Sequence, residues 1–192
     1  GTGGLLLGGL AVSSPYRLER LTTFMDPWAD PFDSGFQLTQ SLMAFGRGEW
    51  LGVGLGSSVQ KLFYLPEAHT DFVFAVLAEE LGLLGVCVII ALYVLLVWRA
   101  FVVAAQAARA DNLFASYLSY GIGIWFGLQS FVNIGVNMGL LPTKGLTLPL
   151  MSYGGSSMVV MCAAVALLLR VDYETRSAAA GQTTAGRRRA RA

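Results

Sequence analysis

Long apolar runs dominate the chain from residue 72 onward. The runs over 72–98, 113–141 and 148–170 are each long enough to cross the roughly 30 Å hydrocarbon core of a bilayer, which takes about 20 helical residues. A shorter run over 1–12 has the character of the last part of another span. Since only helices and closed barrels satisfy their backbone hydrogen bonds in lipid, the pattern predicts an all-α polytopic membrane protein. The truncated first run predicts a piece of a longer protein.

The polar segment 13–71 is much longer than an ordinary connection between helices. Within it, Leu38, Leu42 and Phe45 recur at helical spacing. The opposite face would carry Gln37, Gln40 and Ser41. This alternation predicts a short amphipathic helix over 35–48, lying in the membrane interface.

Two other parts of this segment predict loops and turns. The glycines over 52–58 lack the preceding strand and the spacing of a nucleotide-binding loop, so they predict a flexible loop. The aspartates of DPWADPFD, over 26–33, lie among prolines and do not have the spacing of a calcium loop, so they predict turns.

Charge suggests how the chain crosses the membrane. The formal net charge is +1, yet six of the 13 basic residues lie from Arg170 onward. Basic residues next to a membrane helix mark its cytoplasmic side, so the tail 171–192 is predicted to be cytoplasmic rather than bound to nucleic acid. Counting back through the spans places 99–112 inside as well, and 142–147 and 13–71 outside.

Three carboxylates lie where the polar segment meets the first full apolar run. Because a charge within a membrane helix costs roughly 2.5–3.5 kcal/mol, each of them needs an explanation. For Asp71 two explanations stay open: a helix cap, with Thr70 as another candidate for that position, or a general base at an apolar rim. Glu79 and Glu80 lie too deep to be caps. They must pair within the bundle or face a polar cavity, and the prediction preferred for both is a buried ion pair.

Polar residues around these acids are candidates for contacts with an anionic substrate. Lys144 is bracketed by prolines on the outer side, where it would either hold a phosphate or snorkel to the interface. The full set of candidate binding residues is Lys61, Glu67, His69, Glu79, Lys144, Ser152 and Ser156. Lys61 and Lys144 are also candidate partners for the buried acids. Asn133 and Asn137, one helical turn apart, are predicted to cross-link helices or to line a cavity.

Metal and disulfide chemistry receive little support. The chain has one histidine, and its two cysteines, Cys87 and Cys162, both lie within apolar runs. This composition predicts neither a zinc centre nor a disulfide.

Three long motifs resemble the SEDS family (shape, elongation, division and sporulation), and its division branch more than its elongation branch. They are LPEAHTDFVFAVLAEELG at 65–82, LPTKGLTLPLMSYGGSS at 141–157, and the segment from DPWADPFDSG to SSVQKL at 26–62. The resemblance implies the C-terminal part of a ten-helix bundle. The chain would supply the end of helix seven, a large outer loop carrying the amphipathic helix, and helices eight to ten.

The resemblance also implies an activity, a peptidoglycan glycosyltransferase that polymerises lipid II at the outer face of the membrane and is incomplete in this chain. The essential aspartate of the family's HTDF motif corresponds here to Asp71, whose implied role is to deprotonate the acceptor sugar hydroxyl. No organic cofactor is implied. Mg²⁺ or another divalent cation would suit the leaving pyrophosphate, as would Lys61 and Lys144.

The implied setting is the septum of a dividing bacterium. The ligands would be lipid II, undecaprenyl-pyrophosphate-linked glycan and membrane lipids. The protein partners would be a class B penicillin-binding transpeptidase and other divisome membrane proteins, in the cytoplasmic (inner) membrane.

Two other functions stay open. A lipid II flippase would also use broken helices and intramembrane acids, although its key acid would lie near the midplane, as Glu79 and Glu80 do in the sequence pattern. A non-catalytic scaffold would recruit the transpeptidase and would not need the Asp71 carboxylate.

Overall fold

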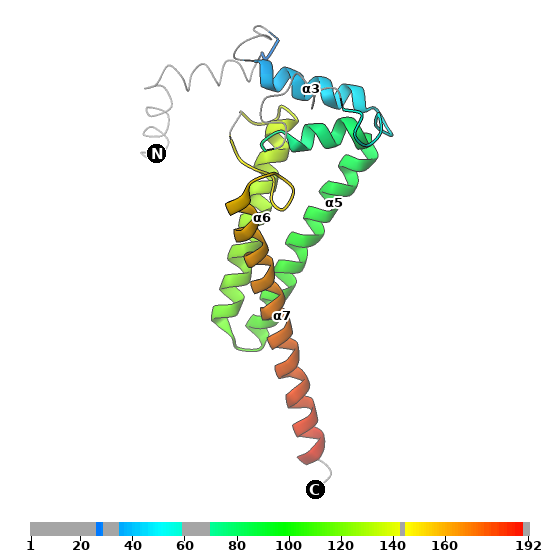
Figure 1. Cartoon of the computed structure of the whole chain (residues 1–192). Helices are drawn as coiled ribbons and strands as arrows, with labels where there is room; N and C mark the ends of the chain where they lie inside the picture. The colour runs from blue at the N-terminus through cyan, green and yellow to red at the C-terminus, as the bar shows by residue number, and fades with distance from the viewer. Residues whose placement is uncertain (1–25, 29–34, 59–69, 143–144, 190–192) are drawn as a thin grey trace, which may run out of the picture. The chain divides into compact units, whose positions relative to one another are not determined.

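The structure is a computed structural model that describes residues 26–28, 35–58, 70–142 and 145–189, with side chains as far as residue 178 (Figure 1). The part of the chain that it describes is all-helical, as predicted. Its helices are α3 (Phe36–Gly48), α5 (Val73–Arg109), α6 (Leu113–Asn137) and α7 (Gly155–Arg189). The expected span end at 1–12 lies outside the described residues.

The three expected spans are all helices, but their ends differ from the predicted ones. Helix α5 continues to Arg109, through most of the expected 99–112 loop, because the alanine-rich stretch FVVAAQAAR favours helix. Helix α7 begins at Gly155 rather than 148, since Pro149 and the glycine pair break the preceding backbone, and it runs on into the expected tail.

Among the residues that the structure describes, two helices are long and apolar enough to cross a membrane by length and hydropathy together. They are α5 and the Gly155–Ala178 part of α7. Helix α6, with 25 residues, is long enough, but its serines, glycines and asparagines make it less apolar.

The chain divides into two compact units, and each is described by itself. Unit 1 comprises Gly1–Val88 and Phe131–Ser152, and unit 2 comprises Ile89–Ser130 and Tyr153–Ala192. The first holds α3, the first turns of α5 and the end of α6. The second holds the rest of α5 and α6 together with α7.

In unit 1, α3 packs against the first turns of α5 (Figure 1). The contact is backbone-close, because a Cβ added to Gly48 would lie 2.0 Å from the Ala78 carbonyl oxygen. The predicted amphipathic helix is therefore present, but its predicted faces are wrong. Gln40 and Ser41 are buried, and Leu42 is only half-buried. The reason is a polar contact, since the Ser41 hydroxyl donates to the backbone oxygen of Asn137 over 2.7 Å.

Helix α5 is not continuous, and the expected 72–98 span contains a break that was not predicted. Gly82 has φ 65° and ψ −167°, a conformation that a residue with a side chain rarely adopts. The break exposes backbone groups on both sides of it, which must find other partners in an apolar environment.

The glycine-rich segment after α3 supplies those partners. Backbone N–H groups of Val53 and Gly54 donate to the carbonyls of Glu79 and Glu80 over 3.0 and 3.1 Å. In return, N–H groups of Leu83 and Leu84 donate to the carbonyls of Glu49 and Trp50 over 2.9 and 3.2 Å. The loop therefore completes the hydrogen bonding of a broken membrane helix, which is a more specific role than the flexible connection predicted.

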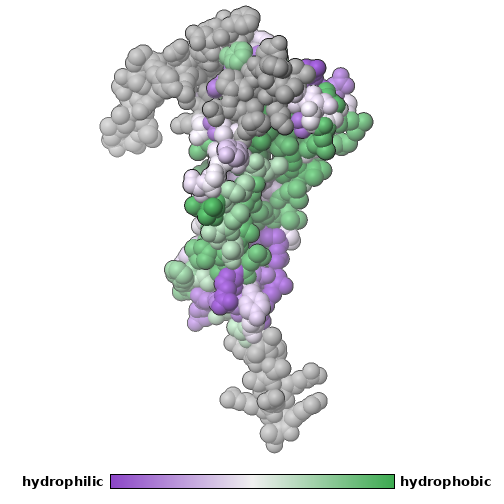
Figure 2. Space-filling model, in the orientation of Figure 1, coloured by the Kyte–Doolittle hydropathy of each residue, from purple (hydrophilic) through white to green (hydrophobic). Residues whose placement is uncertain are grey.

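Unit 2 packs through small residues. A Cβ added to Gly123 of α6 would lie 3.0 Å from the Ala100 Cβ of α5, and Val103, Ala107, Ala115 and Val171 form a buried cluster. Large hydrophobic side chains face outward, and Figure 2 shows them as a continuous green band along the helices. An apolar outer surface of this kind is what a lipid environment requires.

Candidate functional site

Asp71 lies just ahead of α5, at the position where the cap and base explanations differ. The carbonyl of Phe72 accepts hydrogen bonds from the N–H groups of Ala75 and Val76 over 3.0 and 3.3 Å. Phe72 therefore occupies the N-cap position, and Asp71 precedes it. Neither Asp71 nor Thr70 is the cap residue.

Two asparagines of α6 hold the backbone of Asp71 in place. The side-chain amides of Asn133 and Asn137 both donate to the Asp71 carbonyl, over 2.9 and 3.0 Å. The Asn137 side-chain oxygen also accepts from the Ala75 N–H over 3.2 Å, so this amide of the first turn of α5 is shared between Asn137 and the Phe72 carbonyl. Of the two roles predicted for these asparagines, the structure shows the cross-link. We call the pair the asparagine clamp.

The segment 145–152 closes over Asp71 from a second direction. Its Leu146 carbonyl accepts from the Asn133 amide over 2.5 Å. Ser152 is buried, and its hydroxyl donates to the Thr70 carbonyl over 2.5 Å while accepting from the Leu148 N–H over 2.7 Å. Ser152, predicted to contact substrate, therefore ties this segment to the residue before Asp71.

Gly145 lies against the Asp71 carboxylate itself. A Cβ at residue 145 would lie 3.2 Å from Asp71 Oδ2, so a side chain there would crowd the carboxylate. Asp71 is half-buried, with its main chain fixed and one carboxylate oxygen beside a glycine. The main chain of this acid is therefore fixed at the start of an apolar helix.

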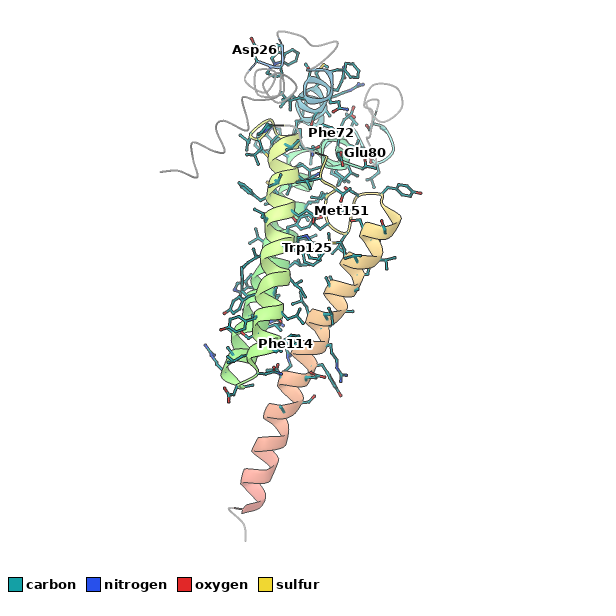
Figure 3. The ribbon with its side chains drawn as sticks, turned by 90° about the vertical axis from the view of Figure 1, so that its left-hand side faces the viewer. Asp26, Phe72, Glu80, Phe114, Trp125 and Met151 are labelled. Atoms are coloured by element: carbon teal, nitrogen blue, oxygen red, sulfur yellow. The ribbon has the colours of Figure 1, made fainter. Side chains whose placement is uncertain are left out.

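Glu79 and Glu80 lie deeper, on the first turns of α5 before the break; Figure 3 labels Glu80 and Phe72 on this segment. Glu79 is fully buried, accepts a hydrogen bond from the Ser58 hydroxyl over 2.5 Å, and lies 3.8 Å from the Arg47 guanidinium. The predicted ion pair is present, with Arg47 as the cation among the described residues. Glu80 is 8% exposed, and its Oε1 has no hydrogen-bond partner in the described part of the chain.

The structure says less about the other predicted site residues. Lys61, Glu67, His69 and Lys144 lie outside the described residues. Ser156 is exposed in the first turn of α7. Among the residues that the structure describes, no group of three or more His, Cys, Asp or Glu side chains is suited to hold a metal ion. Cys87 and Cys162 are exposed, unpaired thiols.

Several contributors to the site were not predicted. Three contacts join residues that are far apart in sequence. They are the hydrogen bonds from the asparagine clamp to the Asp71 carbonyl, the approach of Gly145 to the Asp71 carboxylate, and the Ser58–Glu79 hydrogen bond. The break at Gly82 had a signal, a glycine within an apolar run next to two acids. A second signal was the unusual density of glycines at 52–56, which matches a loop that must approach another backbone closely.

Comparison with known proteins identifies the family. Residues 2–177 match the model of the family described as cell cycle protein, FtsW/RodA/SpoVE. The chain belongs to the FtsW/RodA/SpoVE family. The match covers most of the chain and confirms the SEDS resemblance drawn from the three motifs. With two membrane-capable helices, it makes this chain part of a membrane protein.

Relatives within the FtsW/RodA/SpoVE family are close in sequence. A protein of Nitrosococcus halophilus named "Probable peptidoglycan glycosyltransferase FtsW" is 67% identical over 91% of this chain and 45% of its own length. One of Alkalilimnicola ehrlichii with the same name is 68% identical over 92% of this chain and 45% of its own length. These matches support the division branch, FtsW, over the elongation branch. This chain spans less than half the length of these curated relatives.

A solved structure agrees with the fold. A chain of a peptidoglycan synthase complex, described as coordinating polymerization and crosslinking, matches with a TM-score of 0.68 and 36% sequence identity. The match covers 91% of this chain and 47% of that one. The match supports the helical fold of the described residues as that of the family.

Proposed function

We propose that this chain is the C-terminal part of a peptidoglycan glycosyltransferase of the FtsW type, which polymerises lipid II into glycan strands during bacterial cell division. The observation that carries the proposal is the fixed position of Asp71. Its main chain is held by both arms of the asparagine clamp, and its carboxylate lies beside Gly145 at the start of an apolar helix. The names of the close relatives point to the same chemistry.

The location of Asp71 suits the substrate. Lipid II has a polyprenyl tail that belongs in the bilayer and a disaccharide that belongs in water, so the reacting atoms meet at the boundary between them. The Asp71 carboxylate accepts the proton of the acceptor sugar hydroxyl. The hydroxyl oxygen then forms a bond to the anomeric carbon of the other sugar, and the bond from that carbon to the pyrophosphate oxygen breaks.

The departing lipid pyrophosphate needs cationic neighbours, and we assign this role to the basic residues of the outer side, with Lys61 and Lys144 as first candidates. Glu67 and His69 would tune the same loop. Because the described acids do not form a cluster that fits a cation, no step of this mechanism is assigned to Mg²⁺.

The proposed setting follows from the branch of the family. The complete protein would lie in the cytoplasmic membrane at the septum, with α7 ending in the cytoplasm. Its partner would be a class B penicillin-binding transpeptidase, consistent with the pairing of polymerization and crosslinking in the similar complex. Other divisome membrane proteins would complete the assembly.

A flippase is the less favoured alternative. It would place its key acid near the middle of the membrane, whereas the span that follows the Gly82 break, 83–109, contains no acidic residue. Glu79 and Glu80 belong to the short segment before the break, beside α3 and its loop.

The experiment that separates these functions places the complete protein and its transpeptidase in vesicles. Lipid II is supplied on the outer side only. We expect glycan chains to form without passage of lipid II across the bilayer. Passage of labelled lipid II with no glycan formed would overturn the proposal in favour of a flippase.

A further inference from the structure

Unit 2 contains a cavity where the end of α5 and the turn to α6 meet α7. Its volume is about 750 Å³, within the roughly 300–1,000 Å³ of typical small-molecule sites. The end of α5 and the turn to α6 line one side, with Gln106, Arg109 and Asp111, and α7 lines the other with Thr175 and Arg176. The catalytic proposal uses none of these residues.

The cavity has an unbalanced positive charge. Arg176 pairs with Asp172, whose Oδ1 lies 3.0 Å from the arginine Nε. The same carboxylate also lies 3.9 Å from Arg99. Arg109 has no carboxylate partner in the part of the chain that the structure describes. The Asp111 carboxylate lines the same cavity and would repel an anion bound there. Two guanidinium groups, carried by different helices, therefore line one cavity, and one of them is uncompensated.

The surrounding side chains place the cavity at the depth of lipid headgroups. Tyr117 of α6 and Tyr173 of α7, each within six residues of a cavity-lining residue along the chain, are 70% and 66% exposed. Exposed Trp and Tyr side chains gather where a membrane meets water. Figure 2 shows hydrophilic side chains in purple just beyond the green apolar band, around the turn between α5 and α6.

We propose that this cavity binds the headgroup of an anionic glycerophospholipid of the phosphatidylglycerol type. Arg109 and Arg176 hold the phosphate, since a guanidinium donates two parallel hydrogen bonds to phosphate oxygens. The acyl chains lie along the outward apolar surfaces of the helices.

The neighbouring polar groups fit the hydroxyls of a glycerol headgroup. Thr175 donates its own hydroxyl proton to the Val171 carbonyl over 2.8 Å, so its oxygen is left to accept a hydrogen bond from the headgroup. The Gln106 amide supplies both a donor and an acceptor on the opposite wall. The site does not depend on the proposed enzymatic activity.

In the test, the complete protein is released from phosphatidylethanolamine bilayers that contain phosphatidylglycerol. Native mass spectrometry then counts the phosphatidylglycerol molecules that stay bound to it. The double variant Arg109→Gln/Arg176→Gln should retain at least about fivefold less of it, since each basic residue near a membrane surface contributes about that factor. The matched control is Arg170→Gln. Arg170 also carries one positive charge on α7, but it pairs with Glu174 over 2.7 Å and does not line the cavity.

A gain-of-binding variant protects the test from loss of folding. Asp111→Asn removes the opposing charge and keeps the left-handed backbone, φ 59°, which asparagine adopts readily, so retention should rise. Wild-type retention by the double variant, or an equal loss in Arg170→Gln, would overturn the proposal. Displacement of the lipid by soluble glycerol phosphate would also overturn it, because the site would then bind a free anion.

Discussion

At the scale of single residues, the site depends on how Asp71 is held as much as on its carboxylate. Caps usually come from the residue at the helix start, but here Asn137 from another helix also accepts from the Ala75 N–H, which donates to the Phe72 carbonyl as well. The presence of Asn133 and Asn137 at one-turn spacing could be read from the sequence, but their target could not, because it lies more than 60 residues away along the chain.

Asn137→Ala tests the clamp. The substitution removes one of the two acceptors of the buried Ala75 N–H and one of the two donors to the Asp71 carbonyl. We expect the free energy of unfolding to fall by about 1–3 kcal/mol and the rate of lipid II polymerisation to fall about tenfold or more, since small displacements of a reacting group are costly. Thermal unfolding and glycan formation at saturating lipid II measure the two effects.

Ser130→Ala is the matched control for this prediction. Ser130 is also a buried polar residue of α6, but its hydroxyl donates only to the Phe126 carbonyl of its own helix, over 2.7 Å. Its polymerisation rate should stay within about twofold of wild type, because this bond lies within one helix. If both variants kept full activity, the clamp would not position Asp71.

At the scale of elements, the main departure from sequence-based expectation is the break at Gly82. Hydrophobicity predicted the helices correctly, because burial in lipid constrains composition over about 20 residues. It could not predict which backbone groups a loop would satisfy. The hydrogen bonds from the N–H groups of Val53 and Gly54 depend on main-chain geometry. The sign of that geometry in the sequence is the density of glycines in this loop.

Gly52→Ala tests whether the loop is a structural part of α5. A Cβ at residue 52 would lie 2.1 Å from the Glu80 carbonyl oxygen, so the loop would have to leave the break. The free energy of unfolding should fall by about 3 kcal/mol or more. The Gly52→Ala substitution should also make the 49–58 loop sensitive to protease.

Gly56→Ala is the control for backbone strain alone. Its φ of +81° is close to the +77° of Gly52, but an added Cβ would meet nothing within 4 Å. The left-handed backbone costs about 1–2 kcal/mol, so this variant should lose only that amount. Equal losses in the two variants would mean that the loop does not depend on its fit against α5.

At the scale of the whole molecule, the membrane topology proposed from charge can be tested by labelling. In a background without Cys87 and Cys162, Ser57→Cys should react with an impermeant maleimide in intact spheroplasts. Ser177→Cys should react only after permeabilisation. Both serines are exposed, so neither result depends on local burial. The reverse pattern would contradict the orientation derived from the basic residues near α7.

The central claim is that Asp71 is the base of a glycosyl transfer. The most direct measurement compares lipid II polymerisation by the complete protein and its transpeptidase for wild type, Asp71→Asn and Asp26→Asn, at equal folded amounts. Asp26 is an exposed carboxylate of the same outer segment, so its loss should be silent. We expect Asp71→Asn to lower the rate about 100-fold or more, the contribution of a general base, while transpeptidase binding persists. Full activity of Asp71→Asn would contradict the account and would make this carboxylate a structural group.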